Sequence, residues 1–165
     1  MIQLRSRSID DTRAIAASIA HLARNRDLIV LAGPMGAGKT AFAQGFARSL
    51  GIHEPVTSPT YTLVHTYQAG RTTLHHADLY RLEHTAEVED LGLDEMREDS
   101  IILVEWGDVV DLGPQLRVEL ELGDLPARGG DGDECERGLV LTSTDRSWAP
   151  RWERLEAAVE RWLVG

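Results

Sequence analysis

One octapeptide, Gly33–Thr40, constrains the fold of this chain more than any other segment. Its sequence, GPMGAGKT, fits the pattern G-x-x-x-x-G-K-[ST], in which a glycine-rich loop between a strand and a helix surrounds phosphate with backbone N–H groups. Lys39 within it is the only lysine among the 17 lysines and arginines of the chain. A compact ammonium on a flexible stem reaches between phosphates in a way that a planar guanidinium does not.

The sequence on either side of the octapeptide predicts the strand and the helix that such a loop needs. Residues 28–32, LIVLA, form a continuous apolar run, which is typical of a parallel strand buried on both faces. Phe42, Phe46 and Leu50 then recur at helical spacing and are followed by Gly51, a residue type that commonly ends helices. We therefore interpret the octapeptide as a true phosphate loop and not as a plain glycine-rich turn.

The remaining elements predict an α/β fold of the P-loop NTPase type, with a mostly parallel central sheet and helices on both faces. Strands are expected at residues 2–5, 61–67, 72–79 and 101–105, and helices at about 11–25 and 85–91. Residues 116–122 and 138–143 predict a C-terminal β pair joined by a glycine-rich loop at 127–137, and an aromatic-faced helix is expected from Pro150 onward. Residues 1–165 show no repeat and are expected to form a single domain.

Composition argues against several classes of protein. The net charge of −10 repels nucleic acid, so we expect no direct high-affinity binding to it. The single cysteine, Cys135, excludes an internal disulfide. No run approaches the roughly 18 apolar residues of a membrane span, and residues 1–5 lack the apolar core of a signal peptide. A cytoplasmic protein that does not bind membranes is therefore expected.

Two carboxylates that follow predicted strands are candidates to complete a magnesium site with the Thr40 hydroxyl. Glu105 ends the strongly apolar run 101–104, and Asp78 ends a more polar strand on the same face as His76. We favour Glu105 as a metal ligand or a water-orienting base, with Asp78 acting through Mg²⁺ or its water shell. A turn-capping carboxylate is the alternative interpretation of Asp78.

Three further residues allow more than one interpretation. Thr60, about twenty residues after the loop in Ser58-Pro59-Thr60, suits a threonine that senses the γ-phosphate through Mg²⁺, and it equally suits a proline-led turn. Trp106 follows Glu105 and is expected near the nucleotide, at a partner surface or in the core. Arg81 is expected to contact phosphate or a partner, or to form a surface ion pair.

Five segments together resemble the TsaE family, the bacterial ATPase subunits of tRNA threonylcarbamoyladenosine synthesis. They are GPMGAGKT at 33–40, SPTYTLV at 58–64, HADLYR at 76–81, LGL at 91–93 and VEW at 104–106. The phosphate loop is shared by many families, and the other motifs make the resemblance specific over about residues 8–107. The chain departs from the family at Pro34 and Met35, where an acidic or small residue and a leucine are usual.

The resemblance implies a weak, Mg²⁺-dependent ATPase that serves the protein pair transferring the threonylcarbamoyl group to A37 of tRNAs reading ANN codons. That partner is a TsaD/TsaB-like heterodimer, so tRNA is met only indirectly. The catalytic residues would be Lys39, Glu105, Asp78 and Thr60. The Mg²⁺ ligands would be Thr40, Glu105 and Asp78. ATP would lie against Thr12, near the adenine, and against Gly33, Pro34, Met35, Gly36, Ala37, Gly38, Lys39, Thr40 and Ala41.

Competing classes differ in motifs that can be checked in this chain. A guanine-specific switch needs an Asn-Lys-x-Asp element, which a chain whose only lysine is Lys39 cannot have. A small-molecule P-loop kinase remains the alternative, although Arg128 and Arg137 would make only a thin arginine lid. Stimulation by protein partners, or by a small phosphate acceptor, would separate these alternatives.

Overall fold

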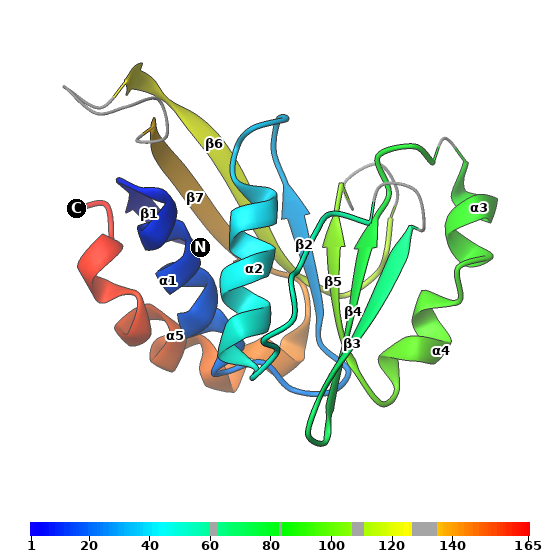
Figure 1. The fold of residues 1–165 in the computed structure, drawn as a ribbon. Coiled ribbons are helices and arrows are strands. Elements are labelled where there is room, and N and C mark those ends of the chain that lie inside the picture. The colour runs from blue at the N-terminus through cyan, green and yellow to red at the C-terminus, as the bar shows by residue number, and fades with distance from the viewer. Residues whose placement is uncertain (60–62, 83, 107–110, 127–134) are drawn as a thin grey trace.

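The structure, a computed structural model, describes residues 1–59, 63–82, 84–106, 111–126 and 135–165. Its centre is one seven-stranded sheet in the order β1-β7-β6-β2-β5-β4-β3 (Figure 1). The strands are β1 (Ile2–Ser6), β2 (Leu28–Ala32), β3 (Val64–Ala69), β4 (Thr72–Asp78), β5 (Ile101–Glu105), β6 (Leu116–Pro126) and β7 (Cys135–Ser143).

Parallel pairing is confined to the middle of the sheet, where β2 lies between β5 and β6 and β4 pairs with β5. Antiparallel pairs, β3–β4 on one side and β6–β7–β1 on the other, extend this centre. The predicted α/β fold is confirmed. The predicted C-terminal β pair is also present. Its first strand, β6, pairs in parallel with β2, so the β pair belongs to the central sheet.

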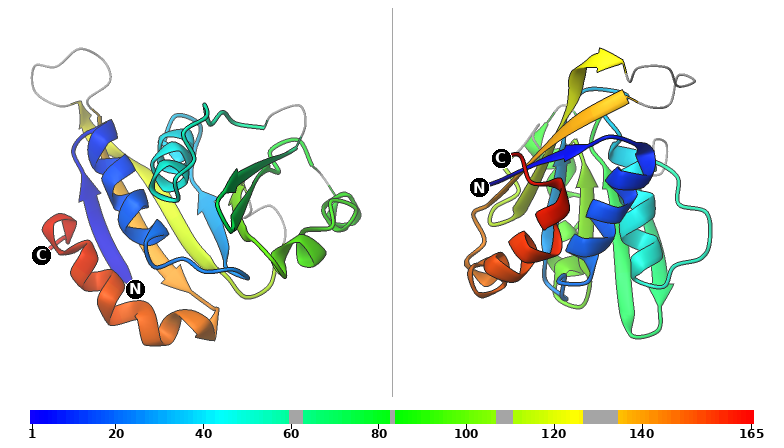
Figure 2. Two further views of the ribbon diagram at one scale, coloured as in Figure 1. Left: turned by 60° about the horizontal axis from the view of Figure 1, so that its bottom comes forward. Right: turned by 90° about the vertical axis from the view of Figure 1, so that its left-hand side faces the viewer.

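Helices cover both faces of the sheet, as Figure 1 and Figure 2 show. On one face α1 (Ile9–Ala20), α2 (Lys39–Ser49) and α5 (Trp152–Ala158) enclose the larger core, which contains the strand residues Ile29 and Leu31. On the other face the short helices α3 (Thr85–Glu89) and α4 (Leu93–Arg97) cover a smaller cluster around Val30 and Val104. No helix in the described ranges is long and apolar enough to cross a membrane.

The element bounds differ from the predictions in several places, including β6 and β7, which are longer than expected, and α3, which is shorter. α1 ends at Ala20, earlier than expected, because the chain turns there toward β2. β3 begins at Val64, and residues 61–62 of the predicted strand lie outside the described residues. α4 was not predicted. The expected C-terminal helix is a 3₁₀ turn at Arg146–Arg151, then α5, then a second 3₁₀ turn, because Asp145 caps a turn that starts before Pro150.

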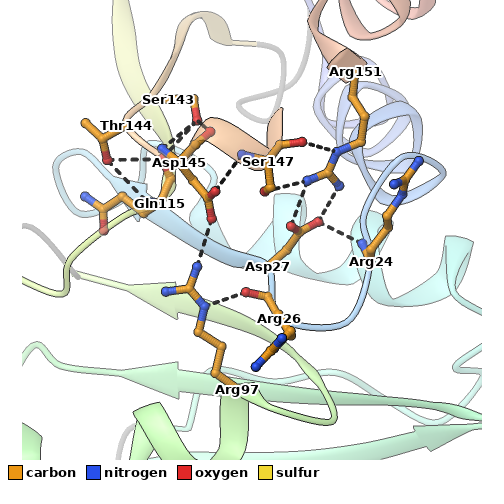
Figure 3. Close-up of polar contacts among 10 residues, drawn as sticks. All are labelled: Arg24, Arg26, Asp27, Arg97, Gln115, Ser143, Thr144, Asp145, Ser147 and Arg151. Carbon is orange, nitrogen blue, oxygen red and sulfur yellow. Dashed lines mark hydrogen bonds and ion pairs between the residues drawn. The ribbon is translucent and has the colours of Figure 1, made fainter. Parts of the chain in front are cut away.

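A buried ion pair fastens this C-terminal segment to the start of β2 (Figure 3). Arg151 donates from Nη1 to Asp27 Oδ2 at 2.7 Å and from Nη2 to Asp27 Oδ1 at 2.9 Å. Arg151 Nη1 also reaches the Leu22 carbonyl at 2.8 Å, and Asp27 accepts the backbone N–H of Arg24. Both charges are buried and fully hydrogen-bonded, which is the condition under which a buried pair can be tolerated.

We expect Arg151→Met to lower the free energy of unfolding by about 3–5 kcal/mol, because it leaves the Asp27 carboxylate buried without its charge partner. Urea denaturation measures this change. Arg154→Met, at an exposed position of α5, is the matched control and should stay within about 0.5 kcal/mol of the parent. Equal losses of unfolding free energy in the two variants would show that the buried ion pair with Asp27 does not stabilise the fold.

A second carboxylate of the same network, Asp145, has a perturbed pKa. Burial acts to raise the pKa of Asp145, but hydrogen bonds from Ser147 and the charges of Arg97 and Arg151 outweigh burial and leave the pKa lowered. Arg97 Nη2 lies 2.9 Å from Asp145 Oδ2. A carboxyl whose pKa falls on folding stabilises the protein above its unfolded pKa, about 3.9, and loses this contribution as pH falls through the folded pKa.

Asp145→Asn should therefore lower the free energy of unfolding at neutral pH and make its decline between about pH 5 and pH 2 shallower than in the parent. Urea unfolding at a series of pH values tests this expectation. If the free energy of unfolding falls equally steeply with decreasing pH in the two proteins, Asp145 does not contribute to the pH dependence.

Candidate functional site

The phosphate loop lies at the edge of the sheet where three parallel strands end. The arrowheads of β2, β5 and β4 meet at this edge in Figure 1. In register, Leu31 of β2 lies opposite Glu105 of β5, and Glu105 lies opposite Asp78 of β4. The chain leaves β2 through Gly33 and enters α2 at Lys39. The loop and both candidate carboxylates are therefore brought together by strand pairing alone.

Of the three loop glycines, Gly33 and Gly36 are required for different reasons. Gly33 has φ of +133°, and a Cβ there would stand 2.2 Å from the carbonyl oxygen of Leu120 in β6. Gly36 has φ of +80°, but no atom lies within 4 Å of its Cβ position. Gly33 thus needs both backbone freedom and space, whereas Gly36 needs backbone freedom only.

Lys39 is buried at the start of α2. Its Nζ donates to the carbonyl of Gly33 at 2.7 Å and to that of Pro34 at 2.8 Å. The same ammonium lies 4.0 Å from the ring centroid of Trp106, which in turn packs against Tyr80 with ring centroids 4.9 Å apart. The aromatic residue after Glu105 therefore packs at the phosphate loop, where its face stabilises the lysine cation.

Oxygen atoms from three different segments converge beside the loop. Ser58 Oγ lies 2.8 Å from Asp78 Oδ2 and 2.9 Å from Glu105 Oε2, and Thr40 Oγ1 lies 3.5 Å from Glu105 Oε1. A hydroxyl carries one proton and cannot donate to both carboxylates. The other Asp78 oxygen, Oδ1, accepts the backbone N–H of Tyr80 at 2.9 Å, so Asp78 caps a turn and also faces the cluster.

Glu105 is ionised at neutral pH although it is buried. Burial acts to raise the pKa of its carboxyl. Interactions with His76 and Ser58, together with the charge of Lys39, outweigh burial and hold the pKa of Glu105 below its usual range. The carboxylate therefore stays ionised, the form that a metal ligand requires.

The donor set fits magnesium. Mg²⁺ prefers hard oxygen ligands and is commonly held by one or two carboxylates together with substrate phosphates and water. Thr40, Asp78 and Glu105 offer such oxygens, and a divalent cation would satisfy them better than the single Ser58 proton does. Within the described ranges no group of three or more His, Cys, Asp or Glu side chains could hold a metal ion, so phosphate and water would have to complete the coordination.

Of the two remaining predicted residues, only Thr12 can be placed, and it is not part of this cluster. Thr60 lies outside the described residues. Thr12 is buried on α1, where its hydroxyl lies 2.8 Å from that of Ser6. Ser6 lies opposite Arg137 of β7 in the sheet. Arg137 in turn contacts the phosphate loop at Gly38.

The position of Arg137 corrects the expected loop at 127–137. Residues 127–134 lie outside the described residues, but Arg137 belongs to strand β7 and is only 8% exposed. Its Nε lies 3.2 Å from the Cβ position of Gly38, so the guanidinium packs directly on the phosphate loop. The alternation of Arg137 with Leu139 and Leu141 was the available signal, because residues two apart on a strand share a face.

A glycine loop between a buried parallel strand and a helix, with a lysine and a hydroxyl at the helix start and carboxylates on neighbouring strands, defines a P-loop nucleotide-binding protein. The family model described as "Threonylcarbamoyl adenosine biosynthesis protein TsaE" matches residues 6–128. The chain belongs to the TsaE family.

Individual relatives agree with this assignment. The tRNA threonylcarbamoyladenosine biosynthesis protein TsaE of Bacillus subtilis is 38% identical over 159 residues, which cover 94% of this chain and 95% of the relative. The Streptomyces coelicolor protein of the same name is 37% identical over 83% of this chain and 93% of its own. The crystal structure of Bacillus subtilis YdiB matches with a TM-score of 0.74 at 30% identity, and the match covers 95% of this chain and 97% of YdiB.

Gly33 and Gly36 allow a direct comparison. We expect Gly36→Ala to lose about 1–2 kcal/mol of unfolding free energy from backbone strain alone. Gly33→Ala should lose more, because its Cβ would also overlap the β6 backbone at Leu120. Urea denaturation of both variants measures the difference, and equal losses would show that β6 does not constrain the loop.

Proposed function

We propose that this protein is a Mg²⁺-dependent, ATP-binding and weakly hydrolysing accessory subunit in the threonylcarbamoylation of A37 in tRNAs reading ANN codons. The observation that carries the proposal is the approach of the Thr40 hydroxyl, at the start of α2, to Glu105, with Asp78 opposite Glu105 in the sheet. Family membership supports the place in tRNA modification, since the relatives are named as threonylcarbamoyladenosine biosynthesis proteins.

Binding of ATP in this proposal uses positive charge concentrated at one point of an acidic molecule. The loop N–H groups at the start of α2 face the phosphates, where the positive end of the helix dipole favours anions. Lys39 exchanges the carbonyls of Gly33 and Pro34 for phosphate oxygens. Arg137 adds a second buried cation against Gly38, which is electrostatically favourable when an anion is bound there.

Thr40 and Glu105 would hold Mg²⁺, with Asp78 ligating it directly or through water. When bound, the ion neutralises charge on the phosphates. The residues themselves position the nucleotide and orient the attacking water, so no covalent intermediate with the protein is expected. Ser58 ties its segment to the two carboxylates, and for this reason we propose that the segment through Thr60 responds to the γ-phosphate.

The proposed partner is a TsaD/TsaB-like heterodimer in the cytoplasm, and tRNA would be met only through that complex. The net charge of −10 supports indirect contact with tRNA. The alternative, a small-molecule kinase, loses support because Arg137, half of its expected arginine lid, lies in β7.

The test is phosphate release from Mg·ATP by the chain alone and with the candidate partner proteins. We expect low turnover alone, a rise with partners, and loss of turnover in Lys39→Ala without loss of the folded state by circular dichroism. Arg48→Ala, an exposed cation on the same helix, is the control and should keep turnover. The proposal would be contradicted by a rate of phosphate release that does not change when the partner proteins are added. It would also be contradicted by turnover that persists in a folded Lys39→Ala protein.

A further inference from the structure

His76 is a fully buried polar side chain that packing alone does not explain. It lies on β4, two residues before Asp78 and on the same face of the sheet, and its surface is 0% exposed. Within the described part of the chain neither of its ring nitrogens has a hydrogen-bond partner. A buried imidazole without hydrogen bonds is unfavourable, and an apolar side chain of similar size would avoid that cost.

The neighbouring histidine shows the contrast. His75 points to the opposite face of the sheet, is only partly buried, and has its Nδ1 2.9 Å from the hydroxyl of Thr66. Its polar atoms are accounted for by an ordinary surface contact. His76, by contrast, has a carboxylate within ion-pair range: Oε1 of Glu105 lies 3.6 Å from its Nε2.

The surroundings of Glu105 indicate what His76 does. One carboxylate oxygen, Oε2, is held by Ser58 at 2.9 Å. The other, Oε1, has Thr40 Oγ1 at 3.5 Å and His76 Nε2 at 3.6 Å, both at or just beyond normal hydrogen-bond length. A small rotation of the carboxyl group would bring Oε1 within reach of an N–H on Nε2 and fix the direction in which the carboxylate faces Thr40.

We propose that His76 is a positioning residue for the magnesium site: its Nε2–H donates to Glu105 Oε1 and orients that carboxylate toward the metal. The inference rests on the proposed function, because it concerns the Mg²⁺ that accompanies ATP. Hydrogen bonds from outside the coordination sphere orient metal ligands, and removing them typically weakens metal affinity about 10–100-fold.

The test compares two side chains of similar length at position 76. His76→Gln keeps an N–H donor, and His76→Met removes it. His75→Met is the control on the opposite face. For each protein, the dissociation constant of a fluorescent ATP analogue is measured in excess EDTA and across a Mg²⁺ titration, and the melting temperature is measured without metal or nucleotide.

His76→Met should shift the Mg²⁺ midpoint to about 10–100-fold higher concentration, with unchanged affinity for the analogue in EDTA and a melting temperature at or above the parent's. His76→Gln should recover most of the Mg²⁺ affinity, and His75→Met should behave as the parent does. A parental Mg²⁺ midpoint in His76→Met, or no recovery in His76→Gln, would overturn the positioning role. A joint loss of melting temperature and of metal-free binding would also overturn it, because it would show that His76 serves the fold.

The unmodified protein distinguishes failure of this inference from failure of the proposed function. If it does not bind the analogue, or binds with no dependence on Mg²⁺, the proposed function fails whatever the variants do. If it binds with clear Mg²⁺ dependence and His76→Met does the same, only the role of His76 fails.

Discussion

The parallel pairing of β2, β5 and β4 is the constraint on which the site depends. Because Leu31, Glu105 and Asp78 are in register, the strand pairing places the two carboxylates next to the loop that leaves β2. A slip of one residue in β5 would turn Glu105 to the opposite face of the sheet. Tight packing of the loop against β6 at Leu120 then holds the loop beside these carboxylates.

The two edges of the sheet use buried charge in different ways. At the edge remote from the loop, Asp27 and Arg151 hydrogen-bond to each other, and Arg151 also donates to the Leu22 carbonyl, so the charges join the C-terminal segment to the core. At the loop edge, Ser58 is shared between two carboxylates and His76 is buried without a hydrogen bond in the described structure. Polar groups without full hydrogen bonding in an otherwise well-packed molecule are typical of functional sites, where the arrangement that function requires lowers the stability of the fold.

Local patterns predicted the parts of the fold that depend on local physics. The apolar run of β2, the helical spacing of Phe42 and Phe46, and the glycine-rich turn between them are short-range features, and the structure has them where expected. The strands that end in Asp78 and Glu105 are predicted by the sequence, which also places both carboxylates at one site, but the direct pairing of the two strands is not predicted. The glycines before Arg137 predict a loop there, whereas the structure places it in a strand, because β7 pairs with both β1 and β6.

The sequence by itself determined the chemistry available to this protein: one lysine in a phosphate loop, a hydroxyl after it, and carboxylates at strand ends. Those choices depend on residue type and short spacing, which a linear pattern records. Only the tertiary structure decided which groups meet, including Ser58 with both carboxylates, Trp106 with Lys39, Arg137 with Gly38, and His76 with Glu105. These contacts join residues far apart in the chain, and strand order and register, which follow from the packing of the whole sheet, bring them together.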